Sequence, residues 1–239
     1  MLNEFLQTSS LWGVGLTLGA FALGTLVNRV TKKAVFNPLL LGSLAVIGVL
    51  TLLRIPYAAY QASAAPVSWL LLPATVSLAV PLYEKWTLLR KNAAAILAGI
   101  AAGTVVSLGT VLVMVWALGL DHAQFVTLLP KSVTTAISMD ISAELGGIAS
   151  LTGAVVILTG IVGNLLAQSV CKWFHITNPM AKGVAIGTAA HAIGTSKALE
   201  LGETEGAMSG LSIAVAGIMT AALSPLFAGL LYICAAAMR

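Results

Sequence analysis

One stretch of the sequence places a lysine, three hydroxyl side chains and two carboxylates close together. The residues PKSVTT at positions 130–135 lead into Asp140 and Glu144. A proline at the start of a helix leaves free backbone N–H groups and the positive end of the helix dipole. These groups suit a small carboxylate, and a hydroxy acid better still, whereas a cation site would use carbonyl and acid oxygens without a lysine. The stretch predicts four substrate-binding side chains: Lys131, Ser132, Thr134 and Thr135.

A second polar stretch, GTAAHAIGTSKALE, occupies positions 187–200. His191 titrates in the physiological range, so it could relay a proton, and Asp140 is a second candidate for proton coupling. The alternative for His191 is a neutral ring that makes two interhelical hydrogen bonds. Lys197 and Glu200, at i and i+3, could simply pair at a helix end. The substrate-binding prediction extends to four residues of this stretch: Thr188, His191, Gly194 and Thr195.

The elements that hold these stretches must lie in a membrane. Apolar residues make up 59% of the 239 positions and charged residues only 8%, against roughly 25% charged residues in soluble domains. Continuous apolar runs indicate helices rather than the short alternating segments of a β-barrel. Six runs are candidate spans: Ser10–Val27, Pro38–Leu53, Val67–Tyr83, Ala93–Leu120, Ile148–Val170 and Gly206–Met238.

Two shorter and more polar segments remain, Val126–Gly147 and Gly183–Leu201. The predicted fold is an all-α polytopic membrane protein, with residues 1–239 as a single transmembrane domain of about 6–8 membrane segments that include broken or re-entrant helices. A charge near the bilayer centre costs roughly 2.5–3.5 kcal/mol. Lys131 must therefore face a protein interior, a water-filled cavity or the interface, and the alternative for Lys131 and Glu144 is snorkelling at the membrane edge.

Basic residues set the predicted orientation. They cluster at positions 29–33 and 85–91, which the positive-inside rule places in the cytoplasm, with the N-terminus outside. The loop at positions 121–124 has no Lys or Arg and should be outside, whereas the loop at 172–182, with a lysine at each end, should be inside. One crossing separates these two loops, so Val126–Gly147 is predicted to re-enter rather than cross.

The chain contains a short internal echo. LLPATVSLAV at Leu71–Val80 matches LLPKSVTTAI at Leu128–Ile137 in five of ten positions. The alternative to a structural repeat is a chance match between apolar segments of low complexity. Proline-interrupted segments in corresponding positions mark the substrate sites of many secondary transporters. Four positions are predicted helix breaks: Pro73, Pro81, Pro130 and Gly187.

Several function classes lack their signatures. There is no basic patch for nucleic acid, no nucleophile elbow and no phosphate loop, so neither a nucleic-acid partner nor an enzyme is predicted. The three histidines are too far apart for a metal site, and no cofactor is expected. Cys171 and Cys234 are interpreted as small buried hydrophobes rather than a disulfide or a metal pair.

The first ten residues contain Glu4 and lack a basic n-region. No cleavable signal peptide is therefore predicted, and no Arg/Ser-rich transit peptide is visible. These features favour the bacterial cytoplasmic (inner) membrane.

Five blocks of the sequence resemble the LrgB/CidB family, and the match runs from about Asn37 to the C-terminus. One departure is Ala136, which stands where the family block usually has a second proline. A residue that precedes a proline disfavours the α conformation, so without this proline Thr135 can adopt that conformation more easily. The matching blocks are PKSVTTAIS at Pro130–Ser138, GGI at Gly146–Ile148, GTAAHAIGTSKALE at Gly187–Glu200, LLPATVSLAVPLYEKW at Leu71–Trp86 and EGAMSGL at Glu205–Leu211.

The resemblance implies two roles. Members are known as antiholin-like regulators of murein hydrolase export and cell lysis, and are commonly encoded with a small LrgA/CidA-like membrane partner. The family also resembles the plastid glycolate/glycerate transporter, and some bacterial relatives are associated with pyruvate uptake. Seven residues fall on the family's motif positions: Lys131, Ser132, Thr134, Thr135, His191, Gly194 and Thr195.

The main hypothesis is a secondary transporter for a small carboxylate such as glycolate, glycerate, lactate or pyruvate, embedded in membrane lipid and forming a homo-oligomer. The alternative is an antiholin-like regulator of murein hydrolase activity that assembles with the small partner. Small-residue faces suitable for such assembly occur at Gly99, Gly103 and Ser107, and at Gly206 and Gly210.

Overall fold

The protein is built from helices long enough to cross a bilayer. Every regular element among the described residues is a helix, and four of them have the required length and apolar composition. This confirms the prediction of an all-α polytopic membrane protein. The four are Trp12–Thr31, Ala93–Leu118, Ala149–Trp173 and Glu203–Leu230. The computed structural model describes residues 11–31, 36, 38–70, 73, 76–77 and 79–236, and gives the backbone alone for residues 79, 81, 82 and 231–236.

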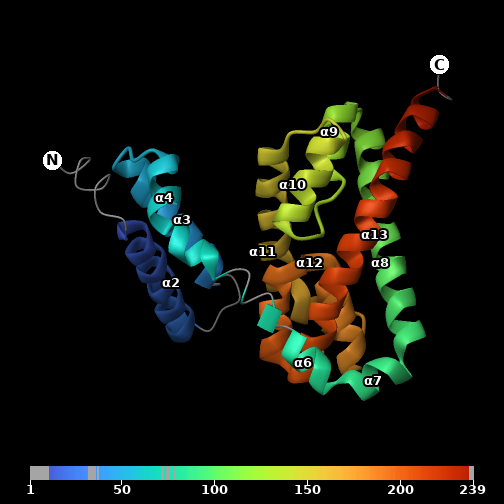
Figure 1. Cartoon of the computed structure of the whole chain (residues 1–239), viewed down its shortest axis with the longest axis horizontal. Helices are drawn as coiled ribbons and strands as arrows, with labels where there is room; N and C mark the ends of the chain where they lie inside the picture. The colour runs from blue at the N-terminus through green and yellow to red at the C-terminus, as the bar shows by residue number, and fades with distance from the viewer. Residues whose placement is uncertain are drawn as a thin grey trace. The chain divides into compact units, whose positions relative to one another are not determined.

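The chain divides into two compact units, residues 1–77 (unit 1) and residues 78–239 (unit 2). In unit 1, the hydroxyls of Thr17 and Tyr60 form a hydrogen bond of 2.8 Å between two helices, and the rings of Trp12 and Tyr60 lie 6.0 Å apart. The helices of unit 1 are α2 (Trp12–Thr31), α3 (Pro38–Leu52) and α4 (Tyr57–Trp69) (Figure 1).

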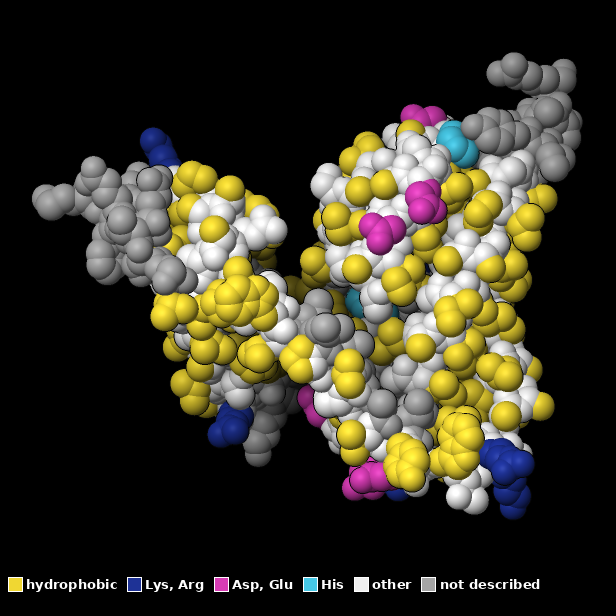
Figure 2. All heavy atoms as spheres, in the orientation of Figure 1, with side chains coloured by type: hydrophobic (Ala, Val, Ile, Leu, Met, Phe, Trp, Pro, Cys, Tyr) yellow, Lys and Arg dark blue, Asp and Glu magenta, His cyan; other side chains and the backbone are white. Residues whose placement is uncertain are grey.

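Unit 2 has a basic end, which carries Lys85, Arg90 and Lys91, and an opposite end. Figure 2 shows basic side chains at the basic end and apolar side chains over much of the face between the two ends. The short helices α6 (Ala79–Glu84) and α7 (Trp86–Lys91) lie at the basic end. The other helices are α8 (Ala93–Leu118), α9 (His122–Leu128), α10 (Thr135–Glu144), α11 (Ala149–Trp173), α12 (Pro179–Leu201) and α13 (Glu203–Ala236).

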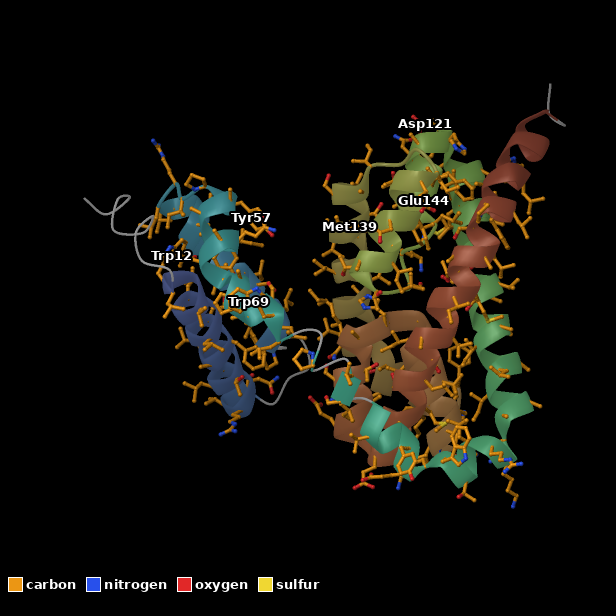
Figure 3. All side chains as sticks on the ribbon, viewed as in Figure 1. Trp12, Tyr57, Trp69, Asp121, Met139 and Glu144 are labelled. Carbon is orange, nitrogen blue, oxygen red and sulfur yellow. The ribbon has the colours of Figure 1, made fainter. Side chains whose placement is uncertain are left out.

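Helices α9 and α10 form a hairpin, called the first hairpin, that enters unit 2 from the opposite end. Asp121, just before α9, and Glu144, the last residue of α10, lie at this same end (Figure 3). The hydroxyl of Thr127 in α9 accepts a hydrogen bond of 2.8 Å from the backbone N–H of Ile148, which precedes α11. The segment predicted to be re-entrant is therefore a hairpin that returns to the end from which it came.

Helix α12 folds back on itself at His191, where φ is 42° and ψ is −140°, and is called the second hairpin. Ile186 and Ala198, on its two arms, belong to one buried cluster, although a straight helix would hold them about 18 Å apart. The second hairpin returns to the basic end, because Glu203, two residues beyond it, pairs with Lys85 at 3.2 Å. The two hairpins thus enter unit 2 from opposite ends.

Two predicted spans do not form membrane-length helices. Helix α3 lies within Pro38–Leu53 but has only 15 residues, fewer than the roughly 20 that a span needs. The run Val67–Tyr83 is divided between α4 and α6. Pro56, with φ of −60°, precedes the first residue of α4, so this helix begins ten residues before the apolar run and ends at Trp69. A hydropathy average reports how apolar a run is, and it does not show where a helix begins or ends within that run.

The predicted internal repeat stays a prediction. Half of its first copy, Leu71–Val80, lies outside the described residues, as does the side chain of Pro81. Pro73 is described and exposed, and Pro81 lies in the first turn of α6, where a helix tolerates proline.

Close packing in unit 2 depends on small residues, as is usual where lipid supplies no hydrophobic drive between helices. A Cβ atom built on Gly187 of α12 would lie 2.8 Å from the Cα atom of Ser209 in α13. On Gly163 of α11, it would collide with the side chain of Ala190. These glycines allow α12 to lie directly against α11 and α13.

The contact at Gly187 gives a stability prediction. Gly187→Ala should lower the unfolding midpoint in detergent, because the new methyl group meets backbone atoms and overpacking costs about 1–3 kcal/mol. Gly229→Ala in α13 is the matched control, since nothing lies within 4 Å of its added Cβ, and helix propensity favours alanine there. Equal midpoints for the two variants in thermal unfolding would contradict the packing of α12 on α13.

The hairpin form of α9 and α10 gives a topology prediction. Single cysteines at Leu118 and Ala143, both exposed, should react with an impermeant maleimide from the same side of the membrane. A cysteine at Thr177 should react from the other side, with Cys171 and Cys234 first replaced by alanine. Labelling of Leu118→Cys and Ala143→Cys from opposite sides would mean that the first hairpin crosses the membrane.

Candidate functional site

An open cleft of about 720 Å³ lies between α8 and the first arm of α12. Asn92 and Asn178, next to the first residues of these helices, line it at the basic end. Lys131 and Ser132, from the turn of the first hairpin, and Thr188, close to the fold of the second, line it at the inner end. The cleft thus connects the basic end of unit 2 with the turns of both hairpins.

Lys131 is half-buried in this cleft and has no acidic partner among the described residues. Its Nζ donates a hydrogen bond of 3.1 Å to the hydroxyl of Ser132. The Ser132 hydroxyl lies 2.9 Å from that of Ser107 on α8, which ties the hairpin turn to the long helix. None of the ion pairs among the described residues includes Lys131. The cleft therefore presents a positive charge whose nearest neighbours are hydroxyl groups.

The inner end of the cleft lies near the middle of the membrane. Ser107 is 14 residues after Ala93 and 11 before Leu118. At about 1.5 Å per residue, α8 is about 39 Å long and Ser107 is about 21 Å from its start. A hydrocarbon core is about 30 Å thick, so the contact between Ser107 and Ser132 holds Lys131 well inside it.

Two further hydroxyls near Lys131 have no hydrogen-bond partner in the part of the chain that the structure describes. Thr104 and Thr188 are 3% and 5% exposed, and the structure gives neither hydroxyl a partner. Both line a cavity of about 10 Å³ beside Ser132, and Thr188 also lines the cleft. Buried hydroxyls are normally satisfied, so Thr188, which lines the cleft, carries a buried hydroxyl that is unpaired among the described residues.

Three predicted residues of the first hairpin lie outside the cleft. Thr134 precedes α10, Thr135 begins it, and Asp140 is on its exposed face together with Glu144. Figure 2 shows acidic side chains facing outward over α10. The structure therefore does not bring Asp140, a predicted proton-coupling residue, to the same site as Lys131.

Three predicted residues of the second hairpin form its fold instead of the cleft wall. The buried ring of His191 donates from Nε2 to the carbonyl of Val156 in α11, at 3.0 Å. The hydroxyl of Thr195 donates to the carbonyl of His191 at 2.9 Å, and lies 2.7 Å from the hydroxyl of Ser209. Gly194 lies where a side chain would meet the first arm of the hairpin. Their observed contacts are structural.

Two predicted helix features need correction. Pro130 does not start a helix: it follows Leu129, which caps the end of α9, so the free N–H groups belong to α10 from Thr135 onward. Gly187 does not break α12, which bends at His191 four residues later. Gly187 serves close packing, whereas the bend at His191 is held by side-chain hydrogen bonds to a neighbouring helix.

Sequence reasoning missed the hydroxyls that α8 contributes. Thr104, Ser107 and Thr110 are spaced at i, i+3 and i+6 in an otherwise apolar helix, so they lie near one face. In the sequence Ser107 stands out for its small size, whereas in the structure its hydroxyl contacts that of Ser132. Polar spacing within an apolar span is the signal that would have found all three.

The sequence model of the LrgB-like family matches residues 17–230, nearly the whole chain. The chain belongs to the LrgB-like family. No solved structure shows a significant match to the chain. The match confirms the resemblance seen in the sequence, and the structure gives the LrgB-like motif residues different positions, with Thr134 and Thr135 at the start of α10. Lys131 and Ser132 face the cleft, whereas His191, Gly194 and Thr195 build the fold of the second hairpin.

The positive φ of His191 gives a prediction that separates the contribution of its backbone conformation to stability from that of its side chain. His191→Gly and His191→Ala both lose the hydrogen bond to Val156, but only glycine adopts this φ without cost. The glycine variant should therefore be about 1–2 kcal/mol more stable than the alanine variant. Thermal unfolding in detergent measures the difference, and an alanine variant at least as stable would show that the backbone there is relaxed.

Proposed function

We propose that this LrgB-like membrane protein is a secondary transporter for a small carboxylate of the glycolate, glycerate, lactate or pyruvate type, in the bacterial cytoplasmic membrane. The observation that carries the proposal is Lys131, a cation near mid-membrane that faces an open cleft and has no acidic partner among the described residues. An uncompensated charge at this depth costs roughly 2.5–3.5 kcal/mol on insertion scales. A carboxylate in the cleft would supply the missing partner.

The groups around Lys131 support a ligand that has both a carboxylate and a polar substituent. Ser132 and Ser107 share a hydrogen bond with each other, and each hydroxyl oxygen has further donor or acceptor capacity. Thr188 adds a buried hydroxyl with no partner. If a carboxylate oxygen of the ligand bound Lys131, a hydroxyl or oxo group on the next carbon would lie close to the hydroxyls of Ser132, Ser107 and Thr188.

The cleft supports a transport cycle in which this form is accessible from the basic end. Asn92 and Asn178 line the cleft at that end. Towards the opposite end, Leu108, Phe125 and Leu129 belong to a buried apolar cluster that packs α8 against the first hairpin. Transport would require this cluster to open while the basic end closes, with the hairpin turns on either side of the ligand.

Regulation of murein hydrolases with a small membrane partner is the other role that the family resemblance implies. The small-residue faces considered for that assembly are used in part within unit 2. A side chain on Gly103 would collide with Thr188, and one on Gly206 with Leu199. Among the described residues, no feature favours this role over transport, and carboxylate transport is therefore the function proposed.

Removal of the Lys131 charge should disable transport. In proteoliposomes, Lys131→Ala should lose roughly 10- to 100-fold in apparent affinity for labelled glycolate or pyruvate, the equivalent of one charge-assisted hydrogen bond of about 1.5–3 kcal/mol. The matched control is Lys197→Ala, which removes a lysine that pairs with exposed Glu200 at 2.7 Å and does not line the cleft. The control should take up substrate like the wild type.

Normal uptake by Lys131→Ala would remove Lys131 from the mechanism. Wild-type protein that is folded yet transports none of the small carboxylates, while deletion of its gene alters autolysis, would support the regulatory role instead.

A further inference from the structure

A second cavity, of about 320 Å³, lies in unit 2 at the basic end and shares no lining residue with the cleft. It is formed where α11 ends and α12 begins. Lys172, His175 and Lys182 line it together with the polar side chains of Gln168 and Thr177. No acidic residue in the described ranges contributes to its lining. The cavity is therefore suited to an anion, and it is separate from the carboxylate site.

The turn between the two helices sets the positions of these groups. The backbone N–H of Ile176 bonds to the carbonyl of Cys171 at 2.8 Å, and that of His175 to the carbonyl of Lys172 at 3.2 Å. His175 takes a left-handed φ of 53°. The side chain of Asn178 caps α12, so Lys182 follows one turn later. This local geometry places all three nitrogen-bearing side chains around one cavity.

These side chains form no ion pair and no side-chain hydrogen bond within the described part of the chain. Lys172, His175 and Lys182 take part in neither of the ion pairs and in none of the side-chain hydrogen bonds that the structure shows there. At the same end, Lys85 and Lys197 do pair with carboxylates. Among the described residues, no carboxylate therefore neutralises the basic side chains of this cavity.

The surroundings of the cavity place it at the membrane–water interface. Trp173 and Phe174, in the same turn, are 81% and 72% exposed, and exposed aromatic residues at helix ends mark the level of the lipid headgroups. The cavity wall also contains apolar side chains, from Ile176 and Leu201. A soluble anion would contact only the basic side chains, whereas a lipid would contact both the basic and the apolar side chains of the cavity.

We propose that this cavity binds the phosphate-bearing headgroup of an anionic phospholipid. Lys172, His175 and Lys182 donate to the phosphodiester oxygens, and Thr177 adds a hydroxyl beside them. Ile176 and Leu201 contact the glycerol backbone and the first methylene groups, while the acyl chains lie against the exposed apolar surface of α11. Basic pockets between helices on the cytoplasmic side are suited to such headgroups, and the basic end is the one predicted to be cytoplasmic.

The test is lipid retention by the purified full-length protein, measured by native mass spectrometry. The protein in detergent is titrated with phosphatidylglycerol or with phosphatidylcholine, and the bound lipid is counted. The wild type should bind phosphatidylglycerol at roughly 30-fold lower concentration than phosphatidylcholine, because each of the two lysines near the headgroup favours the anionic lipid by about 1 kcal/mol. Lys172→Gln with Lys182→Gln should abolish this preference.

The matched control is Arg90→Gln with Lys91→Gln, which removes the same two charges from exposed positions of α7 at the same end. It should keep the wild-type preference. Three results would overturn the proposal: equal binding of both lipids by the wild type, an equal loss of preference in the control variant, or displacement of bound lipid by an equal concentration of soluble glycerol 3-phosphate. Size-exclusion profiles of both variants establish that each is folded.

Discussion

The interior of a bilayer offers backbone N–H and C=O groups no water, so every break in a helix at that depth must find its partners within the protein. Unit 2 has two such breaks. At the second hairpin, His191 donates to the carbonyl of Val156, and Asn164 donates to the carbonyl of Ile193 at 2.8 Å. At the first, Ser138 donates to the carbonyl of Pro130 at 2.6 Å. Buried polar side chains on neighbouring segments make both turns possible.

These two turns are also what creates the candidate site. The hairpins enter from opposite ends of unit 2, and their turns lie beside Thr104 and Ser107, near the middle of α8. Discontinuous helices that meet near mid-membrane are the arrangement in which secondary transporters hold their substrates. The turns of the two hairpins thus bring Lys131 and several hydroxyl groups to the wall of one cleft.

Some motif residues face the cleft and others hold the fold of a hairpin, and the sequence alone does not distinguish the two groups. Lys131 faces the cleft, whereas His191, equally prominent in the sequence, is 2% exposed and binds the backbone of α11. Asp140 lies on the outside of α10. The apolar faces of unit 2 and the basic groups at one of its ends fit a molecule surrounded by lipid, in which Lys131 is a charge held inside the protein.

Composition indicated a membrane protein, because so few charges cannot cover the surface of a soluble domain, and the long apolar runs indicated helices rather than a β-barrel. The basic loops and the polar content of Val126–Gly147 predicted that this segment does not cross, in agreement with the first hairpin. Tertiary structure decided where α12 bends and which side chains face the cleft, to which α8 contributes Ser107, with Thr104 in the small cavity beside it. These outcomes depend on packing between residues far apart in the sequence, such as Gly187 against Ser209, and no local pattern encodes which partner each face will meet.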